Sequence, residues 1–118
     1  MPKTDELLQR ISKLLKSSSK KSYEVAETNF RVGQAISEAC RDSGEEVIGN
    51  IAAILNQKGI SVSLNFLFDA YRVFRSIRSE ATLNEIRRRL NGNLRWGFLV
   101  HNGTSAPLGD TEEAALYW

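Results

Sequence analysis

The sequence predicts an all-α fold, a compact bundle of about six helices that contains a helix-turn-helix-like unit. The two prolines, Pro2 and Pro107, lie close to the ends of the chain, so no proline interrupts a helix between them. Apolar residues recur at helical spacing, whereas the alternation of β-branched residues that marks a strand is scarce. A chain of 118 residues, of which 42% are hydrophobic, can bury one core. We therefore expect a single helical domain over residues 1–118.

Residues 1–21 are expected to form an amphipathic helix and a polar connection. Thr4 suits the N-cap position, and Asp5 and Glu6 favour the positive end of the helix dipole. The hydrophilic stretch "KSSSKKS" then connects this helix to the helical core, residues 22–118. The apolar stripe of the helix consists of Leu7, Leu8, Ile11, Leu14 and Leu15.

The helical core is expected to start with a long helix at about 22–42, whose apolar face is wide enough for a central position. Gly33 lies between two groups of apolar side chains, where the missing Cβ lets another helix approach closely. A third helix is expected after "DSG", because Glu45 and Glu46 suit its positive N-terminus. Gly59 is expected to end that helix.

Residues 45–79 match a helix-turn-helix unit. Ser61 or Ser63 can cap a fourth helix that continues to about Ser79. The glycine-containing turn before it has about four residues, which is the spacing of the motif. Helical hairpins with glycine turns are also frequent in other all-α proteins, so the pattern leaves a purely structural helix pair open.

The last part of the chain is less uniform. A fifth helix is expected at "TLNE", where Thr82 begins a capping box. Residues 94–101, "LRWGFLVH", fit either a helix or a strand that leads into the wing of a winged helix. Asp110 begins a second capping box, but hardly more than one turn of helix follows it. We therefore expect that the chain is a fragment and that the natural protein continues past Trp118.

The residue types needed for catalysis or metal binding are nearly absent. The chain has one histidine, His101, and one cysteine, Cys40, and no acidic cluster stands beside either of them. Neither a nucleophile motif nor a phosphate-binding glycine loop occurs. We expect no cofactor, no metal site, no small-molecule substrate and no enzymatic activity within this chain.

Two features indicate a soluble protein of the cytoplasm. No run of about 18 apolar residues is present, and the charged start "MPKTDELLQR" lacks the apolar centre of a signal peptide. Cys40 cannot form an internal disulfide and fits a reducing compartment as a small buried hydrophobe. We therefore expect no membrane partner.

Positive charge is concentrated in the later part of the chain, although the net charge is only +2. Residues 58–101 hold eight Lys and Arg against three Asp and Glu, a net charge of +5. Residues 1–57 hold eight of each kind, and residues 102–118 hold three acidic residues and no basic one. An anionic partner is therefore expected to contact residues 58–101.

The fourth expected helix combines a wide apolar face with a narrow polar strip. A recognition helix needs this arrangement, because the core must hold it from behind while the strip enters a groove of duplex DNA. On this hypothesis Ser61 and Ser63 offer donors to phosphate, and the residues that approach base edges are Asn65, Arg72 and Ser76. The expected contacts to backbone phosphates are Arg75, Arg87, Arg88 and Arg95.

Structural explanations compete with this hypothesis. Any central helix of a bundle has the same pattern, and the arginines of "IRRRLNGNLRW" also fit a solvated basic face. Trp96 fits the core better than a base-stacking platform. A second hypothesis is a helical module that binds another protein or forms a homodimer without nucleic acid, since a short chain does not necessarily cover such wide apolar stripes. The two hypotheses are compatible, because helix-turn-helix proteins often dimerise.

Two stretches of the helical core resemble a known family. "YEVAETNFRVGQAISEA" followed by "EEVIGNIAAILNQKGISVSLNFLFDAYRVF" is similar to the N-terminal helical domain of the bacterial YhcG-type proteins, which a PDDEXK-type nuclease domain typically follows. The resemblance implies a DNA-binding or targeting module of a nuclease or defence-type protein, and it implies helix at 94–101. No acidic "PD…ExK" set occurs in the chain, so cleavage is not expected of it. The resembling positions include Asn29, Gly33, Gly59, Tyr71 and Trp96.

Overall fold

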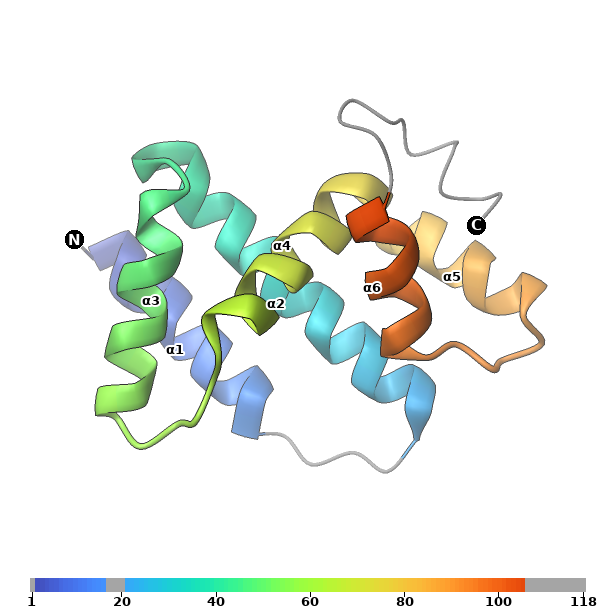
Figure 1. The fold of residues 1–118 in the computed structure, drawn as a ribbon, viewed down its shortest axis with the longest axis horizontal. Coiled ribbons are helices and arrows are strands. Elements are labelled where there is room, and N and C mark those ends of the chain that lie inside the picture. Colours follow the sequence, from blue (N-terminus) through green and yellow to red (C-terminus); the bar gives the residue numbers. More distant parts are fainter. Residues whose placement is uncertain (1, 17–20, 106–118) are drawn as a thin grey trace.

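The computed structural model describes residues 2–16 and 21–105, and this part of the chain consists of helices and their connections (Figure 1). The predicted all-α class is confirmed, since the described residues hold six helices and no strand. None of these helices has the length and apolar character needed to cross a membrane. The helices are α1 (Pro2–Lys16), α2 (Ser22–Ser43), α3 (Glu46–Gln57), α4 (Leu64–Ile77), α5 (Glu80–Arg89) and α6 (Trp96–Ser105).

The centre of the molecule is the crossing of α2 and α4, which make the most extensive contact of any helix pair. In Figure 1, α1 and α3 lie at one end of this crossing and α5 and α6 at the other. Gly33 is the reason the two helices come so close. A Cβ placed there would lie 2.1 Å from the carbonyl oxygen of Ala70 and 3.1 Å from the Cβ of Phe74. The predicted close approach at Gly33 is therefore confirmed.

The buried apolar side chains form two clusters that share α2 and α4. The first cluster lies among α1, α2, α3 and α4, and the second lies among α2, α4, α5, α6 and the connection before α6. Because α4 contributes to both, its apolar side is held along its whole length. Fully buried members of the first cluster include Ile11, Val32, Ile36, Ile48, Leu55 and Leu67, and those of the second include Val73, Ile77, Leu94 and Leu99.

The connection between α3 and α4 covers residues 58–63, which is longer than the turn expected for a helix-turn-helix unit. Gly59 has a φ of 85°, as expected for a residue that ends a helix. The connection is longer because α3 stops at Gln57 and because Ser63, rather than Ser61, caps α4. The order of the helices matches the prediction, whereas the length of the connection between α3 and α4 does not.

The predicted start of the fifth helix is wrong by one turn. Ser79, and not Thr82, is the N-cap of α5, because its hydroxyl oxygen accepts a hydrogen bond from the backbone N–H of Thr82 at 3.2 Å. Thr82 is inside the helix and is only 8% exposed. The start moves because Arg78 adopts a left-handed conformation, with a φ of 69°, that ends α4 immediately before Ser79.

The ambiguous stretch 94–101 forms no wing. Leu94 and Arg95 precede α6, which starts at Trp96, so the helical alternative is correct. The helix expected after Asp110 lies outside the described residues.

Candidate nucleic-acid interface

The N-terminus of α4 is fixed by hydrogen bonds from two side chains. The hydroxyl oxygen of Ser63 accepts a hydrogen bond from the backbone N–H of Phe66 at 3.0 Å. The side-chain amide of Asn56 donates to the backbone oxygen of Val62 at 3.0 Å and accepts from its N–H at 3.4 Å. Ser61 and Ser63 are both exposed, so either hydroxyl can reach a ligand at this end of the helix.

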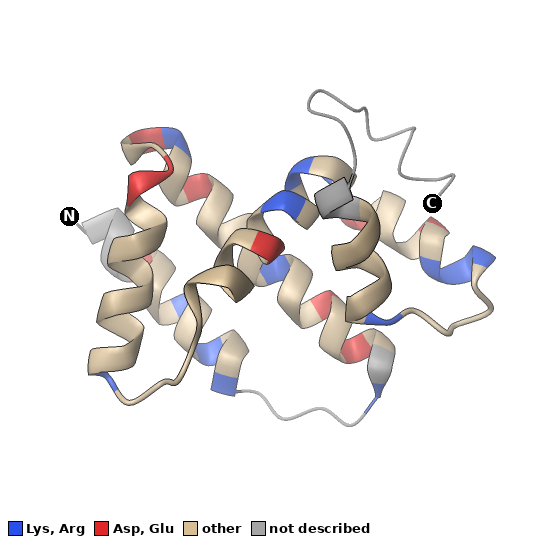
Figure 2. Ribbon diagram, in the orientation of Figure 1, with Lys and Arg blue, Asp and Glu red and all other residues tan. Residues whose placement is uncertain are grey.

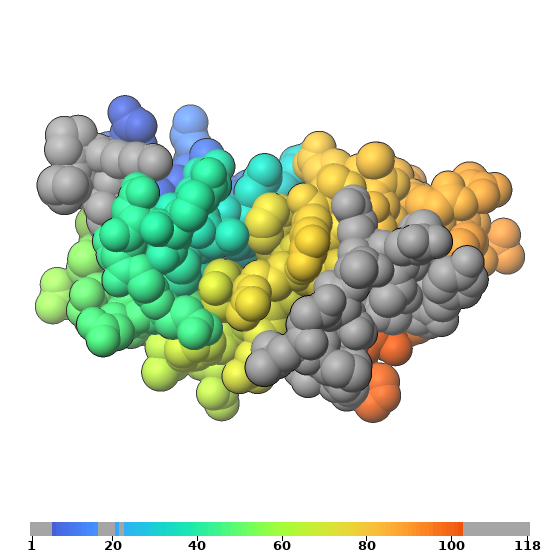
Figure 3. All heavy atoms as spheres, turned by 90° about the horizontal axis from the view of Figure 1, so that it is seen from above, coloured from blue at the N-terminus to red at the C-terminus, as the bar shows by residue number. Residues whose placement is uncertain are grey.

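The polar strip predicted for this helix lies at the surface, and we call it the α4 ridge. Asn65, Arg72 and Arg75 are exposed, whereas Asp69 and Ser76 are half-buried. The opposite side is closed, since Leu67, Ala70, Val73 and Ile77 have no exposed area. Figure 3 shows part of α4 at the surface, in yellow, between the green and teal helices and the orange helix. The ridge consists of Asn65, Asp69, Arg72, Arg75 and Ser76.

The two arginines of the ridge rest on aromatic rings of their own helix. The guanidinium carbon of Arg72 lies 6.0 Å from the centre of the Phe68 ring, and that of Arg75 lies 5.4 Å from the centre of the Tyr71 ring. Neither guanidinium forms an ion pair with any residue that the structure describes. Both charges are therefore available to an anionic ligand.

The C-terminal end of the ridge borders an acidic residue. Burial raises the pKa of the Tyr71 hydroxyl, and the positive charge of Arg75 opposes this rise. Burial also raises the pKa of the Cys40 thiol, where Glu45 adds to the rise and Arg75 opposes it. The charges of Arg75 and Glu45 therefore both influence the pKa values of Tyr71 and Cys40, and in opposite directions.

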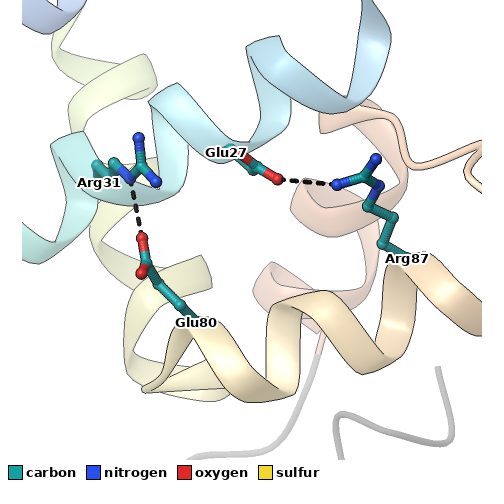
Figure 4. A network of polar contacts seen from close by, with 4 residues as sticks. All are labelled: Glu27, Arg31, Glu80 and Arg87. Carbon is teal, nitrogen blue, oxygen red and sulfur yellow. Dashed lines mark hydrogen bonds and ion pairs between the residues drawn. The ribbon is translucent and has the colours of Figure 1, made fainter.

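Arg87 is engaged in holding α5 against α2. Its Nη1 lies 3.3 Å from the Oε1 of Glu27, and its guanidinium carbon lies 3.8 Å from the centre of the Tyr23 ring. A second ion pair, 2.9 Å between Arg31 Nε and Glu80 Oε1, joins the other end of α5 to α2 (Figure 4). The predicted phosphate contact of Arg87 therefore has to compete with a structural role.

Arg88 and Arg95 differ from each other in whether a carboxylate engages the guanidinium. Arg88 donates two hydrogen bonds to the Glu85 carboxylate, one of them at 3.0 Å, and these bonds lower the pKa of Glu85. The Arg88 side chain is nevertheless 74% exposed, and such surface pairs are weak. Arg95 is exposed before the start of α6 and has no ion pair among the described residues.

Trp96 belongs to the core, as the structural explanation predicted. It is half-buried, its ring centre lies 6.2 Å from that of Phe66, and it packs against both apolar clusters. The indole therefore joins α6 to α4.

The described residues contain no group of three His, Cys, Asp or Glu side chains that could hold a metal ion. His101 is exposed on α6, and Cys40 is a half-buried free thiol whose raised pKa keeps it protonated at neutral pH.

The sequence did not indicate a basic groove that lies beside the connection leading into the N-terminus of α4. In the sequence, Lys13 and Lys16 have the character of a soluble helix end, and Lys58 is only the first residue of the basic segment 58–101. In the structure these side chains line a hollow of about 570 Å³ between α1 and the connection 58–63. The spacing of Lys13 and Lys16 placed both on one side of a helix, but no local signal linked them to Lys58. The groove is lined by Glu6, Gln9, Arg10, Ser12, Lys13, Lys16, Lys58 and Ile60.

Comparison of the chain with protein-family models, with curated proteins and with solved structures finds no match. The resemblance to the YhcG-type domain therefore stays a prediction from the sequence.

Proposed function

We propose that the chain is a DNA-binding module, not catalytic by itself, that presents the α4 ridge to duplex DNA. The observation that supports this most is the contrast between the two sides of α4. One side is fully buried in both apolar clusters, and the other carries an exposed amide and two guanidiniums that form no ion pair with a described residue. A rigid helix with a cationic outer strip is what the major groove, about 12 Å wide, accommodates.

The residues of the ridge suit different parts of a duplex. The side-chain amide of Asn65 can make two hydrogen bonds to an adenine, and the guanidinium of Arg72 can make two to a guanine. Ser61 offers a hydroxyl to a phosphate at the positive end of the helix. Arg75, Arg88 and Arg95 are assigned to backbone phosphates, whereas we assign Arg87 mainly to the attachment of α5.

Fluorescence anisotropy of a labelled duplex of roughly two helical turns tests the proposal. With about four charged contacts, the logarithm of the association constant should fall with the logarithm of salt concentration at a slope of about −4. The variant Arg72→Gln/Arg75→Gln should reduce the steepness by about 2 and weaken binding on the order of 50-fold at about 0.1 M salt. Absence of binding by the unmodified protein, or binding without salt dependence, contradicts the proposal.

The control variant is Lys21→Gln/Arg41→Gln, which removes the same amount of charge from exposed positions on and just before α2. It should bind within about threefold of the unmodified protein, because a non-local change of net charge has little effect on a screened contact. Equal weakening by both variants would show that only net charge attracts DNA, and the α4 ridge would then have no special role.

The wider role that we propose, following the sequence resemblance, is the targeting of a nuclease or defence-type bacterial protein to DNA. The competing hypothesis of a protein-binding or dimerising module depended on uncovered apolar stripes. Among the described residues, the exposed large apolar side chains are Val25, at 38%, and Leu64, at 45%. These two residues lie on different helices, α2 and α4, so strongly exposed large apolar side chains are few in the described part of the chain.

A further inference from the structure

We infer that the basic groove between α1 and the connection 58–63 binds the phosphodiester backbone of the same DNA, beside the segment that α4 contacts. This inference rests on the proposed function and extends it to a second contact region. The groove is predominantly basic. Arg10, Lys13 and Lys16 of α1 lie across the groove from Lys58, whereas Glu6 is the single carboxylate among the described residues that line it.

The lysines of the groove are free to bind an anion. Arg10 is neutralised by Glu38, with 2.6 Å between Nη2 and Oε2. Lys13, Lys16 and Lys58 are exposed and form no ion pair with a described residue. Figure 2 shows the basic last turn of α1 and the basic residue that follows α3 along the same edge of the molecule, away from the acidic corner between α2 and α3. A concave surface with one sign of charge concentrates an opposite charge.

The floor of the groove supplies groups that suit a sugar-phosphate chain. The hydroxyl oxygen of Ser12 is buried and has no hydrogen-bond partner among the described residues, which is uncommon for a buried polar atom. This hydroxyl can donate to a phosphate oxygen only after its side chain turns toward the groove, because its oxygen has almost no accessible surface. Ile60 is half-buried and gives the groove an apolar wall, which suits the carbon atoms of deoxyribose.

The position of the groove links it to α4. Lys58 and Ile60 belong to the same short connection as Ser61 and Ser63, and Asn56 fixes the end of this connection through Val62. A strand that passes the N-terminus of α4 therefore reaches the groove without leaving the protein surface. In a helix-turn-helix protein, the N-terminal residues of the recognition helix contact base edges while the preceding helix crosses the backbone. The two regions thus form one footprint, with base contacts on the ridge and phosphate contacts in the groove.

Two measurements on the full chain test the inference. In the anisotropy experiment, Lys13→Gln/Lys58→Gln removes one cation from each side of the groove, and Lys21→Gln/Arg41→Gln is the matched control. We expect the groove to add about 2 to the steepness that the arginine contacts give, and the groove variant to lose this addition and on the order of 50-fold in affinity at about 0.1 M salt. The control should retain the behaviour of the unmodified protein. Equal binding by the groove variant and the control would overturn the inference and leave the ridge unaffected.

Nuclear magnetic resonance separates the groove from the ridge. The backbone amide signals of Ser12, Lys58 and Ile60 should shift on titration with the duplex and also with an oligothymidylate of about eight nucleotides. If the groove signals shift with the single strand while those of Asn65 and Arg72 do not respond to duplex, the groove is a phosphodiester site and the proposed role of α4 is wrong. If inorganic phosphate at the same phosphate concentration produces equal shifts, the assignment to a phosphodiester chain is wrong. No groove shift with either nucleic acid also overturns the inference.

Discussion

The two arginine groups of the chain, Arg72 with Arg75 on α4 and Arg87 with Arg88 on α5, differ in what surrounds them. Each α4 arginine lies over an aromatic ring of its own helix and has no described carboxylate partner. Each α5 arginine has a carboxylate, Glu27 from α2 for one and Glu85 from the same helix for the other. The denser run of arginines in the sequence is therefore the one whose charges are already neutralised.

A positively charged residue in the sequence therefore indicates a binding surface only where the fold leaves its charge without a carboxylate partner. An aromatic ring holds a guanidinium without cancelling its charge, because the attraction comes from the ring quadrupole. A carboxylate cancels the charge and has to be displaced before a phosphate can bind. The same reasoning favours Lys13, Lys16 and Lys58, which have no described ion pair, over Arg10, which pairs with Glu38.

The largest expected effect comes from breaking the support of the α4 ridge. Gly33→Ala places a Cβ 2.1 Å from the carbonyl oxygen of Ala70, and a backbone atom cannot move aside cheaply. We expect the free energy of unfolding to fall by about 3 kcal/mol or more, measured by urea denaturation followed by circular dichroism. Gly49→Ala on α3 is the control, because no atom lies within 4 Å of the added Cβ. That control should stabilise the protein by about 0.5–1 kcal/mol.

The next effect separates the two arginine groups by stability. Arg87→Ala removes both the contact with Tyr23 and the ion pair with Glu27, and we expect a loss of about 1–2 kcal/mol in the free energy of unfolding. Arg72→Ala should remain within about 0.5 kcal/mol of the unmodified protein, because its side chain is exposed and unpaired. Equal losses for the two variants, measured by the same denaturation, would remove the distinction between a structural and a free arginine.

A smaller effect separates the groups by DNA binding. Arg75→Gln should weaken binding to duplex by about eightfold at about 0.1 M salt, since one full phosphate contact is lost. Arg88→Gln should weaken it by only about twofold to threefold, because Glu85 already competes for that guanidinium. Glu85→Gln should correspondingly strengthen binding, and anisotropy measures all three variants. A stronger loss for Arg88→Gln than for Arg75→Gln would reverse our ranking.

The smallest expected effect concerns the titration of Glu85. Hydrogen bonds from Arg88 lower the pKa of the Glu85 carboxyl, so its titration midpoint should lie below that of an ordinary glutamate and return toward it in Arg88→Gln. A lowered folded-state pKa gives a stabilisation that is present above the unfolded pKa and lost as pH falls through the folded one. Carboxyl carbon resonances measured against pH give the midpoint directly. An unchanged midpoint in Arg88→Gln would show that the pair is not formed in solution.

The sequence by itself determined the helical class, the general positions of the helices and the importance of Gly33. These follow from local information, because apolar periodicity and helix-capping preferences act within a few residues along the chain. The start of a helix was predicted less exactly where two nearby residues could both serve as its N-cap. Ser79 caps α5 although "TLNE" offered Thr82, because the left-handed Arg78 ends α4 at that point.

The tertiary structure alone decided which charges are paired between helices and which surfaces are hollow. Glu27 forms an ion pair with Arg87, and Lys13 lines the same groove as Lys58. In both cases the two residues are far apart in the sequence and are brought together by the packing of separate helices. The physical reason is that a side chain's partner on another helix depends on where the helices cross and how each is rotated, which the close contact of Gly33 with Ala70 helps to set. No periodicity within a single helix contains that information.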